Sequence, residues 1–511
     1  MIEVWTALLG LGDRLAAHVI LSAAALALGT AVALPLAIWA GRSPMVARLS
    51  LGFASLVQTV PALALLALFF PILLSLRAVF GEGLPTLGFL PALLALSLYA
   101  LLPILRNAVT ARANLDPGVL EAADGVGMTQ WQKLRLVEAP LSAPFVMAGI
   151  RTAAVWTIGA ATLSTTIGQP SLGDPIFAGL QTQNWALVLA GCIAAAGLAI
   201  ATDGLLGLVE KGLRDRQRWM VWAGSALAAT GLIIAFASQT ADDDDTVTIG
   251  AKNFSEQYIL ARLVGQRLET AGFNVRYRDG LGSAVVHEAV TTGAIDISID
   301  YSGTLWTNQL NRSDNLPAAQ MLSEIKRWEA ETSGALMLGA LGFENAYAFA
   351  MKQSRADELG IRTLDDLARA APTLVMGGDV EFFERPEWKS VRDAYGLKFA
   401  RQRNFTSTFM YDALTGGEAD VISAYTSDGR IAADRLLVLE DPRDALPAYD
   451  ALLILAPQHS ENDQLKAALQ PLIGAIDVAA MREANFAVDR TKDKQTPARA
   501  AAQLAAKLGL D

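Results

Sequence analysis

The sequence has few of the residues that build covalent cross-links, metal centres or hydrolytic sites. Its single cysteine, Cys192, lies in an apolar run, so no intrachain disulfide can form. The three histidines, His18, His287 and His459, are scattered without metal-ligand spacing, and no Ser-His-Asp or paired-carboxylate pattern accompanies them. These absences argue against a disulfide scaffold, a bound metal and an enzyme.

The chain also lacks a phosphate-binding loop. A Gly-rich cradle that ends in Lys-Ser or Lys-Thr occurs nowhere in the 511 residues, and the cluster at Gly280 to Gly282 has no Lys. We therefore expect no cofactor in this chain, and any ATP hydrolysis must take place on a separate one.

Charge is scarce in the first half of the chain and predominantly acidic in the second. Residues 1–240 hold 13 Lys or Arg and 11 Asp or Glu, whereas residues 241–511 hold 28 and 40. The acidic balance argues against nucleic acid as a partner, because phosphate binding needs clustered Lys and Arg. A hydrophobic content of 52% and a mean hydropathy of +0.34 do not suit an all-soluble chain.

Long apolar stretches fill the first half. Six of them reach about 20 residues, enough to cross a bilayer core of about 30 Å. They fall near residues 15–40, 51–76, 87–109, 143–167, 185–209 and 219–237. Prolines inside them, such as Pro35, Pro61, Pro71 and Pro91, predict kinks rather than breaks.

The basic connections between these stretches fall on one side of the membrane. Residues 41–50, 110–142 and 210–218 carry Lys and Arg, whereas the alternate connections carry almost none. Because Lys and Arg resist translocation, the basic side is predicted to be the cytoplasm. The chain is then a multi-pass membrane protein in contact with lipid, and its C-terminal domain is extracytoplasmic.

Four consecutive aspartates, Asp242 to Asp245, separate the apolar half from the soluble half. We interpret residues 238–246 as a solvated linker, because like charges repel and stay hydrated. A calcium site is the alternative, but it would need the alternate ligand spacing and the Gly turn that this run lacks.

From Thr246 onward, short β-rich runs alternate with helix-like segments. This alternation is typical of parallel sheets with covering helices. About 265 residues suffice for two such lobes, and ligands of open α/β sheets bind at the strand ends. The sequence therefore predicts a ligand-binding cleft between two lobes.

The long basic connection carries a recognisable motif. Within residues 116–144, Glu121, Ala122 and Ala123 are followed by Gly127, and Pro140 closes the segment. Physically, Ala122, Ala123, Val126 and Trp131 can form the apolar face of a short amphipathic helix. The segment resembles the EAA loop of ABC-importer permeases, although it reads Val-Glu-Ala-Pro where that family usually has Ile, any residue, then Leu-Pro.

That resemblance implies an ATPase-coupling role for these five residues. In the family the loop docks as a coupling helix into a cytoplasmic ABC ATPase subunit, which binds ATP and magnesium. Because importers of this family use two permease bundles and this chain supplies one, the resemblance implies a homodimer with two ATPase copies.

Several segments of the soluble half carry a second resemblance: GAKNFSEQYILA, DYSGT, FENAYAFAM, MYDAL, SAYTSDGRI and LPAYDALLIL. They are similar to the substrate-binding proteins of osmoprotectant importers, which bind glycine betaine, proline betaine, choline or carnitine. The implied fold is an all-α transmembrane permease joined to a two-lobed α/β periplasmic-binding-protein domain of type II. The implied domains are a permease at 1–218 with a sixth span at 219–237, and a binding domain at 247–511, whose lobes comprise 247–345 with 450–511, and 346–449.

Quaternary ammonium groups cannot donate hydrogen bonds, so proteins surround them with electron-rich aromatic faces. Four tyrosines fall in the matching segments and are the implied cage: Tyr301, Tyr347, Tyr425 and Tyr449. Asn345 would offer an oxygen to the polarised methyl groups. Lys252, Thr304 and Arg385 match positions that contact the betaine carboxylate in the family, which favours a carboxylated ligand over choline.

The sequence thus predicts the permease and binding subunit of an ATP-driven importer for a small betaine. A same-architecture importer for choline, carnitine, ergothioneine or a polar amino acid is one alternative. A ligand sensor or gated channel is another, against which the coupling loop argues.

Overall fold

The computed structural model describes residues 2–81, 84–182, 184–239, 246–312, 314, 316–490 and 492–510. It divides into a helical unit, residues 1–177 with 185–242, and an α/β unit, residues 178–184 with 243–511. The aspartates Asp242 to Asp245, interpreted from the sequence as a solvated linker, lie outside the described residues.

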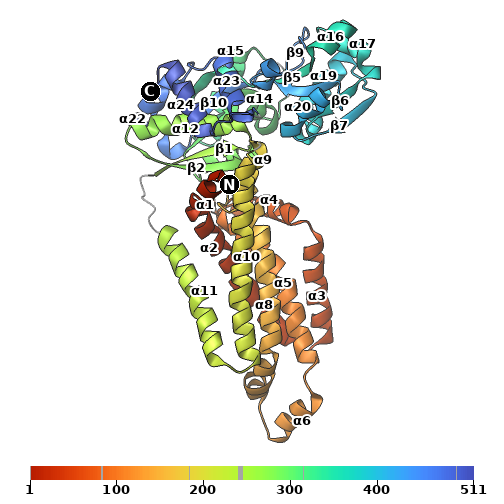
Figure 1. Ribbon diagram of the computed structural model, residues 1–511, viewed down its shortest axis with the longest axis vertical. Helices are drawn as coiled ribbons and strands as arrows, with labels where there is room; N and C mark the ends of the chain where they lie inside the picture. The colour runs from red at the N-terminus through yellow and green to blue at the C-terminus, as the bar shows by residue number, and fades with distance from the viewer. Residues whose placement is uncertain are drawn as a thin grey trace. The chain divides into compact units, whose positions relative to one another are not determined.

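The helical unit is built from long apolar helices (Figure 1). The helices from residue 2 to residue 239 are α1 (Ile2–Leu9), α2 (Gly12–Ala40), α3 (Pro44–Thr59), α4 (Ala62–Phe80), α5 (Phe89–Ala113), α6 (Pro117–Gly125), α7 (Gln130–Lys133), η1 (Leu134–Glu138), α8 (Ala139–Ala161), η2 (Thr162–Ile167), α9 (Gly173–Gln181), α10 (Trp185–Arg214) and α11 (Arg218–Gln239), and α9 runs across the boundary between the two units. Among the described residues, five unbent helical segments are long and apolar enough to cross a membrane, namely 12–40, 89–113, 130–167, 185–214 and 218–238.

The second predicted span is broken. Helices α3 and α4 together pass the same length and composition test, but they meet at an angle of 103°. Val60 has extended backbone angles and Pro61 stands at the N-cap of α4. A residue before proline is driven out of the α region, so the helix ends there. The expectation of a mere kink at Pro61 was wrong.

Small residues let the helices of this unit pack closely. Helix α5 contacts both α2 and α8. A Cβ added to Gly29 of α2 would lie 2.9 Å from the Cβ of Ala100, and one added to Gly149 of α8 would lie 2.8 Å from that of Asn107. Both distances are too short for a side chain, so glycine permits these approaches, as is usual between membrane helices.

The α/β unit contains two five-stranded sheets. In the first, the strand order is β2-β1-β3-β10-β4, with β1 parallel to β2 and β3, and β10 antiparallel to β3 and β4. Its strands are β1 (Thr246–Lys252), β2 (Asn274–Leu281), β3 (Ile297–Tyr301), β4 (Leu336–Glu344) and β10 (Asp450–Leu455). Strands β1, β3 and β10 are buried almost throughout, as expected for strands that are covered on both faces.

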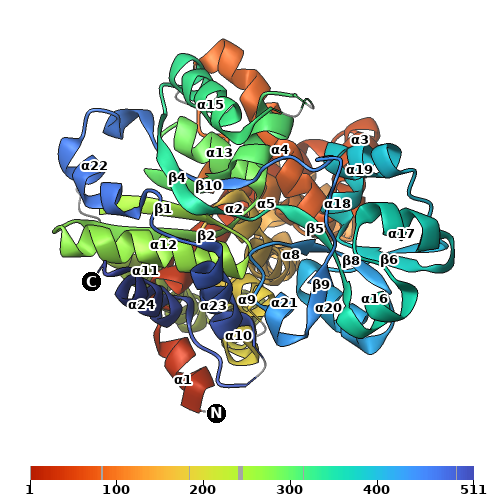
Figure 2. The same ribbon diagram turned by 90° about the horizontal axis from the view of Figure 1, so that it is seen from above.

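Helices cover this first sheet (Figure 2). Helix α12 packs on β1 and β2 and also contacts α23 and α24. Helix α13 contacts β1 and β3, and α15 contacts β4. The helices after the strands of this lobe are α12 (Ser255–Thr270), α13 (Ser283–Thr291), α14 (Ser302–Thr304), η3 (Leu305–Gln309), α15 (Ala318–Thr332), η5 (Pro457–His459), α22 (Asp463–Leu469), η6 (Gln470–Leu472), α23 (Val478–Asp489) and α24 (Pro497–Leu508).

The second sheet has the order β7-β6-β8-β5-β9. Its strands are β5 (Tyr347–Lys352), β6 (Val375–Gly378), β7 (Arg401–Asn404), β8 (Val421–Tyr425) and β9 (Leu436–Val438). Its helices are α16 (Gln353–Leu359), α17 (Leu364–Ala370), η4 (Ala371–Thr373), α18 (Val380–Glu384), α19 (Pro386–Tyr395), α20 (Ser407–Gly416) and α21 (Arg430–Ala433). The predicted fold class, a helical membrane part and a two-lobed α/β domain, is confirmed.

The chain crosses between the two sheets at two adjacent points. One crossing joins β4 to β5 at Asn345, and the other leads into β10 at Tyr449. The backbone N–H of Asn345 donates to the carbonyl of Tyr449 at 2.9 Å, and Glu344 pairs with Asp450 on the next register position. The two crossings therefore form one short hydrogen-bonded hinge, and the ends of both sheets open beside it.

Candidate functional site

A cavity beside this hinge collects every residue that the sequence predicted to touch substrate. Its lining includes all eight of them: Lys252, Tyr301, Thr304, Asn345, Tyr347, Arg385, Tyr425 and Tyr449. They come from positions spread over about 200 residues of sequence, so the fold itself brings them together. Among the described residues, no group of three or more His, Cys, Asp or Glu could hold a metal ion.

Strand ends account for this convergence. Lys252 ends β1, Tyr301 ends β3 and Tyr425 ends β8. Side chains at the carboxyl ends of neighbouring strands face the crevice outside the sheet, where open α/β folds bind ligands. Tyr347 begins β5, which runs antiparallel to β8, and it pairs directly with Tyr425 in the register of the two strands.

Three of the four tyrosines form one aromatic cluster. The ring centroids of Tyr347 and Tyr425 lie 5.1 Å apart at 40°, and those of Tyr347 and Tyr449 lie 5.6 Å apart at 89°. These separations are typical of interacting rings. Tyr301 lies apart from the cluster, and its ring stacks with Phe254 at 6.2 Å. The predicted cage thus consists of a three-ring cluster and one separate ring that line the same cavity.

The two predicted carboxylate-binding cations already have carboxylate partners inside the protein. Lys252 Nζ lies 2.5 Å from Asp300 Oδ1, and these side chains are only 2% and 1% exposed. Arg385 Nη1 lies 3.3 Å from Glu387 Oε1, with both side chains buried. The sequence prediction had not foreseen these pairings. A ligand carboxylate at either cation would share it with a resident carboxylate.

Each cation also lies near a cage ring. Lys252 Nζ is 5.3 Å from the centroid of Tyr301, and the guanidinium carbon of Arg385 is 5.5 Å from that of Tyr347. At these distances a cation is attracted to an aromatic face. The rings of Tyr301 and Tyr347 therefore already contact cations of the protein itself, and they are also the predicted contacts of the ligand cation.

Glu387 connects the two lobes. It lies in α19 of the second lobe and accepts hydrogen bonds from the hydroxyls of Tyr449, at the hinge, and Thr307, in η3 of the first lobe. Burial and the neighbouring Glu387 carboxylate hold the pKa of Tyr449 well above its usual range, so this tyrosine keeps the proton that it donates. The bonds join α19, the hinge and η3 around one carboxylate.

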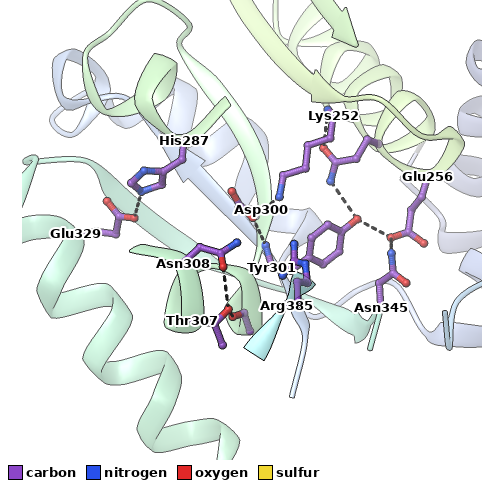
Figure 3. A network of polar contacts seen from close by, with 12 residues as sticks. Lys252, Glu256, His287, Asp300, Tyr301, Thr307, Asn308, Glu329, Asn345 and Arg385 are labelled. Atoms are coloured by element: carbon purple, nitrogen blue, oxygen red, sulfur yellow. Dashed lines mark hydrogen bonds and ion pairs between the residues drawn. The ribbon is translucent and has the colours of Figure 1, made fainter. Parts of the chain in front are cut away.

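A second buried carboxylate, Glu256, lies beside the hydroxyl of Tyr301 (Figure 3). Tyr301 Oη donates to Glu256 Oε1 at 2.6 Å, and the side-chain amide of Asn345 donates to the same oxygen at 3.0 Å. Asn345 Oδ1 has no hydrogen-bond partner in the described part of the chain. Asn345 was predicted to offer an oxygen to the ligand's methyl groups. This role stays a prediction, and Oδ1 is the side-chain atom suited to it.

Sequence reasoning missed the carboxylates behind the cage. Asp300 directly precedes Tyr301, Glu387 follows Arg385 by two residues, and Glu256 lies in the KNFSEQ segment. All three lay inside or beside segments that carried the resemblance, so proximity to a predicted site residue was the available signal. Which partner each one takes depends on side-chain directions that appear only in the folded chain.

The predicted coupling loop folds as two short helices rather than one. Glu121, Ala122 and Ala123 lie in α6, which ends at Gly125, whereas Trp131 lies in α7. Gly127 has a φ of +77° between them, a conformation that glycine adopts at no steric cost. The single amphipathic helix expected through Trp131 was wrong, because the backbone turns at Gly127.

Two ion pairs hold this loop in place. Lys133 Nζ lies 2.7 Å from Asp124 Oδ1 and joins α7 to α6. Arg112 Nε, at the end of α5, lies 3.0 Å from Glu138 Oε2 just before Pro140 and α8. The loop is therefore tied to the membrane helices on which it would have to act.

Apolar side chains remain uncovered on the loop. Val126 is 74% exposed and Trp131 is 67% exposed, and Glu121 and Ala122 are exposed as well. An exposed apolar patch rimmed by polar residues marks an interaction surface.

Two family models match the chain. The model described as the substrate binding domain of ABC-type glycine betaine transport systems matches residues 245–507. The model described as the inner membrane component of binding-protein-dependent transport systems matches residues 33–215. The matches fall on the α/β and helical parts of the chain respectively.

Three relatives show how far the similarity extends. The ergothioneine transport permease/ergothioneine binding protein of Helicobacter pylori is 29% identical over 476 residues, which make up 89% of this chain and 82% of that protein. A permease protein of the glycine betaine/carnitine/choline transport system of Bacillus subtilis is 40% identical over 194 residues, 38% of this chain and 84% of that protein. The glycine-betaine-binding protein of Pseudomonas aeruginosa is 32% identical over 289 residues, 54% of this chain and 91% of that protein.

Proposed function

Since the chain belongs to the osmoprotectant ABC importers, as an inner-membrane permease fused to a glycine-betaine-type substrate-binding domain, we propose that it takes up a quaternary-ammonium solute. Glycine betaine and proline betaine are the first candidates. The chain is a transport subunit rather than an enzyme. The observation that carries the proposal is the cluster of Tyr347, Tyr425 and Tyr449 on the wall of one cavity, with Tyr301 on the same wall.

The cluster suits a trimethylammonium group. Such a cation offers no N–H donor, so ring faces rather than hydrogen-bond acceptors must hold it, and each face contributes about 0.5–2 kcal/mol. Tyr347 is 6% and Tyr449 is 2% exposed, so a cation held there would lose most of its contact with water. Desolvation places the attraction at the upper end of that range.

A zwitterionic ligand also needs a partner for its carboxylate. Lys252 carries three N–H donors, and its bond to Asp300 need not engage all of them. Thr304 lines the same cavity and offers a hydroxyl. We therefore keep Lys252, Thr304 and Arg385 as the proposed carboxylate contacts, each acting beside its resident neighbours.

Transport is proposed to be driven by ATP and magnesium on a separate cytoplasmic ATPase. The exposed apolar patch of the 116–144 loop supports this, as do the ion pairs that tie the loop to α5 and α8. By analogy with the family, two copies of this chain and two ATPase subunits form the working importer. The basic loops favour an extracytoplasmic position for the binding domain.

Ergothioneine is the second candidate substrate. It is favoured by one specific observation, the similarity to the Helicobacter pylori ergothioneine transport permease/ergothioneine binding protein along 89% of this chain. The cage that would hold a betaine would also hold the quaternary ammonium of ergothioneine. The cage alone does not distinguish the two.

Isothermal titration of the full-length protein in lipid nanodiscs tests the proposal. The ligands are glycine betaine, proline betaine, choline, carnitine and ergothioneine, with a polar amino acid as the negative control. Binding of at least one quaternary ammonium ligand, and of no amino acid, is the expected result. Binding of none of the five would refute the substrate class and leave only the family.

Uptake separates an importer from a sensor or a gated channel. Cells that express the chain with its ATPase should accumulate the solute, and changing Glu121 and Gly127 together should abolish accumulation while leaving binding intact. If accumulation survived that double change and no ATPase co-purified, the sensor or channel would be preferred.

A further inference from the structure

Glu256 is a buried carboxylate in the wall of the cavity. It lies in the first turn of α12 and its exposure is only 3%. It accepts hydrogen bonds from Tyr301 Oη at 2.6 Å, from Asn345 Nδ2 at 3.0 Å and from Asn485 Nδ2 at 2.8 Å. These donors are neutral, and Figure 3 shows the bonds from Tyr301 and Asn345.

The cations of the cavity lie beside other carboxylates. Lys252 pairs with Asp300, and Arg385 pairs with Glu387. Arg430 Nη2 pairs with Asp428 Oδ2 at 2.6 Å. Among the described residues, Glu256 forms no ion pair. A buried carboxylate without a cation is costly for a folded protein, and positions that retain one call for an explanation.

Burial acts on Glu256 in the expected direction. It raises the pKa of this carboxyl, and the nearby Asp428 carboxylate raises it further, while the bonds from Ser427, Tyr301 and Asn485 oppose the shift. Burial in the cavity wall thus favours the protonated, neutral form of Glu256 more than water does. A cation that entered the cavity would reverse this preference.

Tyr301 links the carboxylate to the proposed cage. Its hydroxyl donates to Glu256, and Tyr301 is one of the four tyrosines on the cavity wall. A phenol that donates to a carboxylate has a more electron-rich ring, which attracts a cation more strongly. The charge of Glu256 can therefore act on a ligand both directly through the cavity and through the ring of Tyr301.

We propose that Glu256 is a specificity-determining residue of this cavity, whose carboxylate is the counter-charge that selects a quaternary ammonium ligand over a neutral ligand of the same shape. This inference rests on the proposed function and adds to it a charge requirement that aromatic rings alone would impose only weakly. It also assigns a purpose to a buried carboxylate that the carboxylate-binding residues do not explain.

Binding of the cation should be linked to a proton. Because the bound cation stabilises ionised Glu256, binding releases a proton from the fraction of molecules in which the residue is protonated, and affinity rises with pH. The other titratable or charged groups nearby are Tyr301 on β3, the Asp428–Arg430 pair after β8, and Asp489 on α23, which accepts from Ser255 next to Glu256. The Glu256→Gln variant removes only the contribution of Glu256 to this pH dependence and leaves those of the other groups.

Pairs of ligands with the same shape and different charge test the proposal. Full-length protein in nanodiscs is titrated with choline and with its neutral carbon isostere, dimethylbutanol, in which a tert-butyl group replaces the trimethylammonium. If choline gives no heat, glycine betaine and its carbon isostere tert-butylacetate replace the pair. Each titration is repeated at about pH 5 and about pH 8, on either side of the range in which a buried carboxyl titrates, and in buffers of different ionisation enthalpy.

Glu256→Gln should weaken the ligand that carries the trimethylammonium group about tenfold or more, equivalent to about 1.4 kcal/mol, and should not weaken the carbon isostere, whose tert-butyl group is uncharged, by more than about twofold. It should also abolish proton release on binding. Glu256→Asp should retain the preference for the cation, and Glu461→Gln, a change of charge on an exposed residue, should alter nothing. Thermal melting of each variant shows whether it folds.

Equal weakening of the cation and its isostere in Glu256→Gln would overturn the proposal and leave Glu256 as a support for Tyr301. Unchanged binding of the cation would overturn it as well. If the wild type bound none of the quaternary ammonium ligands, the proposed function itself would fail, which is a different result from wild-type binding that ignores Glu256.

Discussion

Tyr347 and Tyr425 face each other across two antiparallel strands, at matching positions of the register, with ring centroids 5.1 Å apart. The register of the second sheet fixes the backbone positions of both residues and holds the two rings close together. A cage built on paired strands is preorganised and spends little binding energy on ordering side chains.

Tyr347 is therefore expected to dominate affinity. Tyr347→Ala removes the ring that contacts both Tyr425 and Tyr449. It should lower the affinity for a quaternary ammonium ligand by roughly one to two powers of ten, because one ring is lost and the two remaining rings lose the contact that positions them. Tyr347→Phe keeps the ring and should cost less than about threefold. Titration calorimetry measures both, with Tyr277→Phe, outside the cavity lining, as the matched control.

The Lys252–Asp300 pair should matter for folding as well as binding. Both side chains are almost fully buried, so Asp300→Asn leaves an ammonium without its partner and should destabilise the α/β domain by about 3–5 kcal/mol. Lys252→Met combined with Asp300→Asn removes both charges and should recover part of the loss. Thermal melting of the wild type, the single variant and the double variant measures this. Equal melting temperatures for the single and double variants would contradict the pairing.

Asp489 should make stability depend on pH. Burial raises its pKa to about 6, above the value of an exposed carboxyl, although Arg430 and the bond from Ser255 oppose the rise. The folded state then holds this proton more tightly than the unfolded state, so its contribution to stability is greatest below about pH 4 and is lost as pH rises through about 6. Melting temperatures measured across this window should show that trend, and Asp489→Asn should flatten it.

Releasing the 116–144 loop from the membrane helices should uncouple ATP hydrolysis from ligand binding without weakening ligand binding itself. Glu138→Ala removes the partner of Arg112 and frees the segment just before α8. In the reconstituted complex with its ATPase, ligand-stimulated hydrolysis should fall severalfold, while the ligand Kd changes less than about twofold. Gln130→Ala, at an exposed position of the same loop, is the control. Full stimulation in Glu138→Ala would show that this tether does not transmit the signal.

The residues that share the cavity were predicted from the resemblance of short segments to osmoprotectant-binding proteins, because each of them matches a position in those segments. Lys252 and Tyr301 end β1 and β3 of the first sheet, and Tyr425 ends β8 of the second. Strand ends of an open sheet meet at one edge, and residues from the edges of both sheets line the same cavity.

The partners of those residues could not be predicted in the same way. Asp300 points toward Lys252, and Glu387 reaches Tyr449 and Thr307 from another lobe. Such pairings depend on side-chain directions and on how lobes pack, which no spacing in the chain records. The break at Pro61 was misjudged for a related reason, since proline permits either a kink or a break and the surrounding packing decides between them.

An experimental structure of the full-length protein with bound glycine betaine, or with ergothioneine if that ligand binds instead, tests the central claim most directly. We expect the trimethylammonium group within about 6 Å of the ring centroids of Tyr347, Tyr425 and Tyr449, with Glu256 behind Tyr301 and the ligand carboxylate toward Lys252 and Thr304. A ligand whose cation lies outside this cavity, or turns away from the three rings, would contradict it.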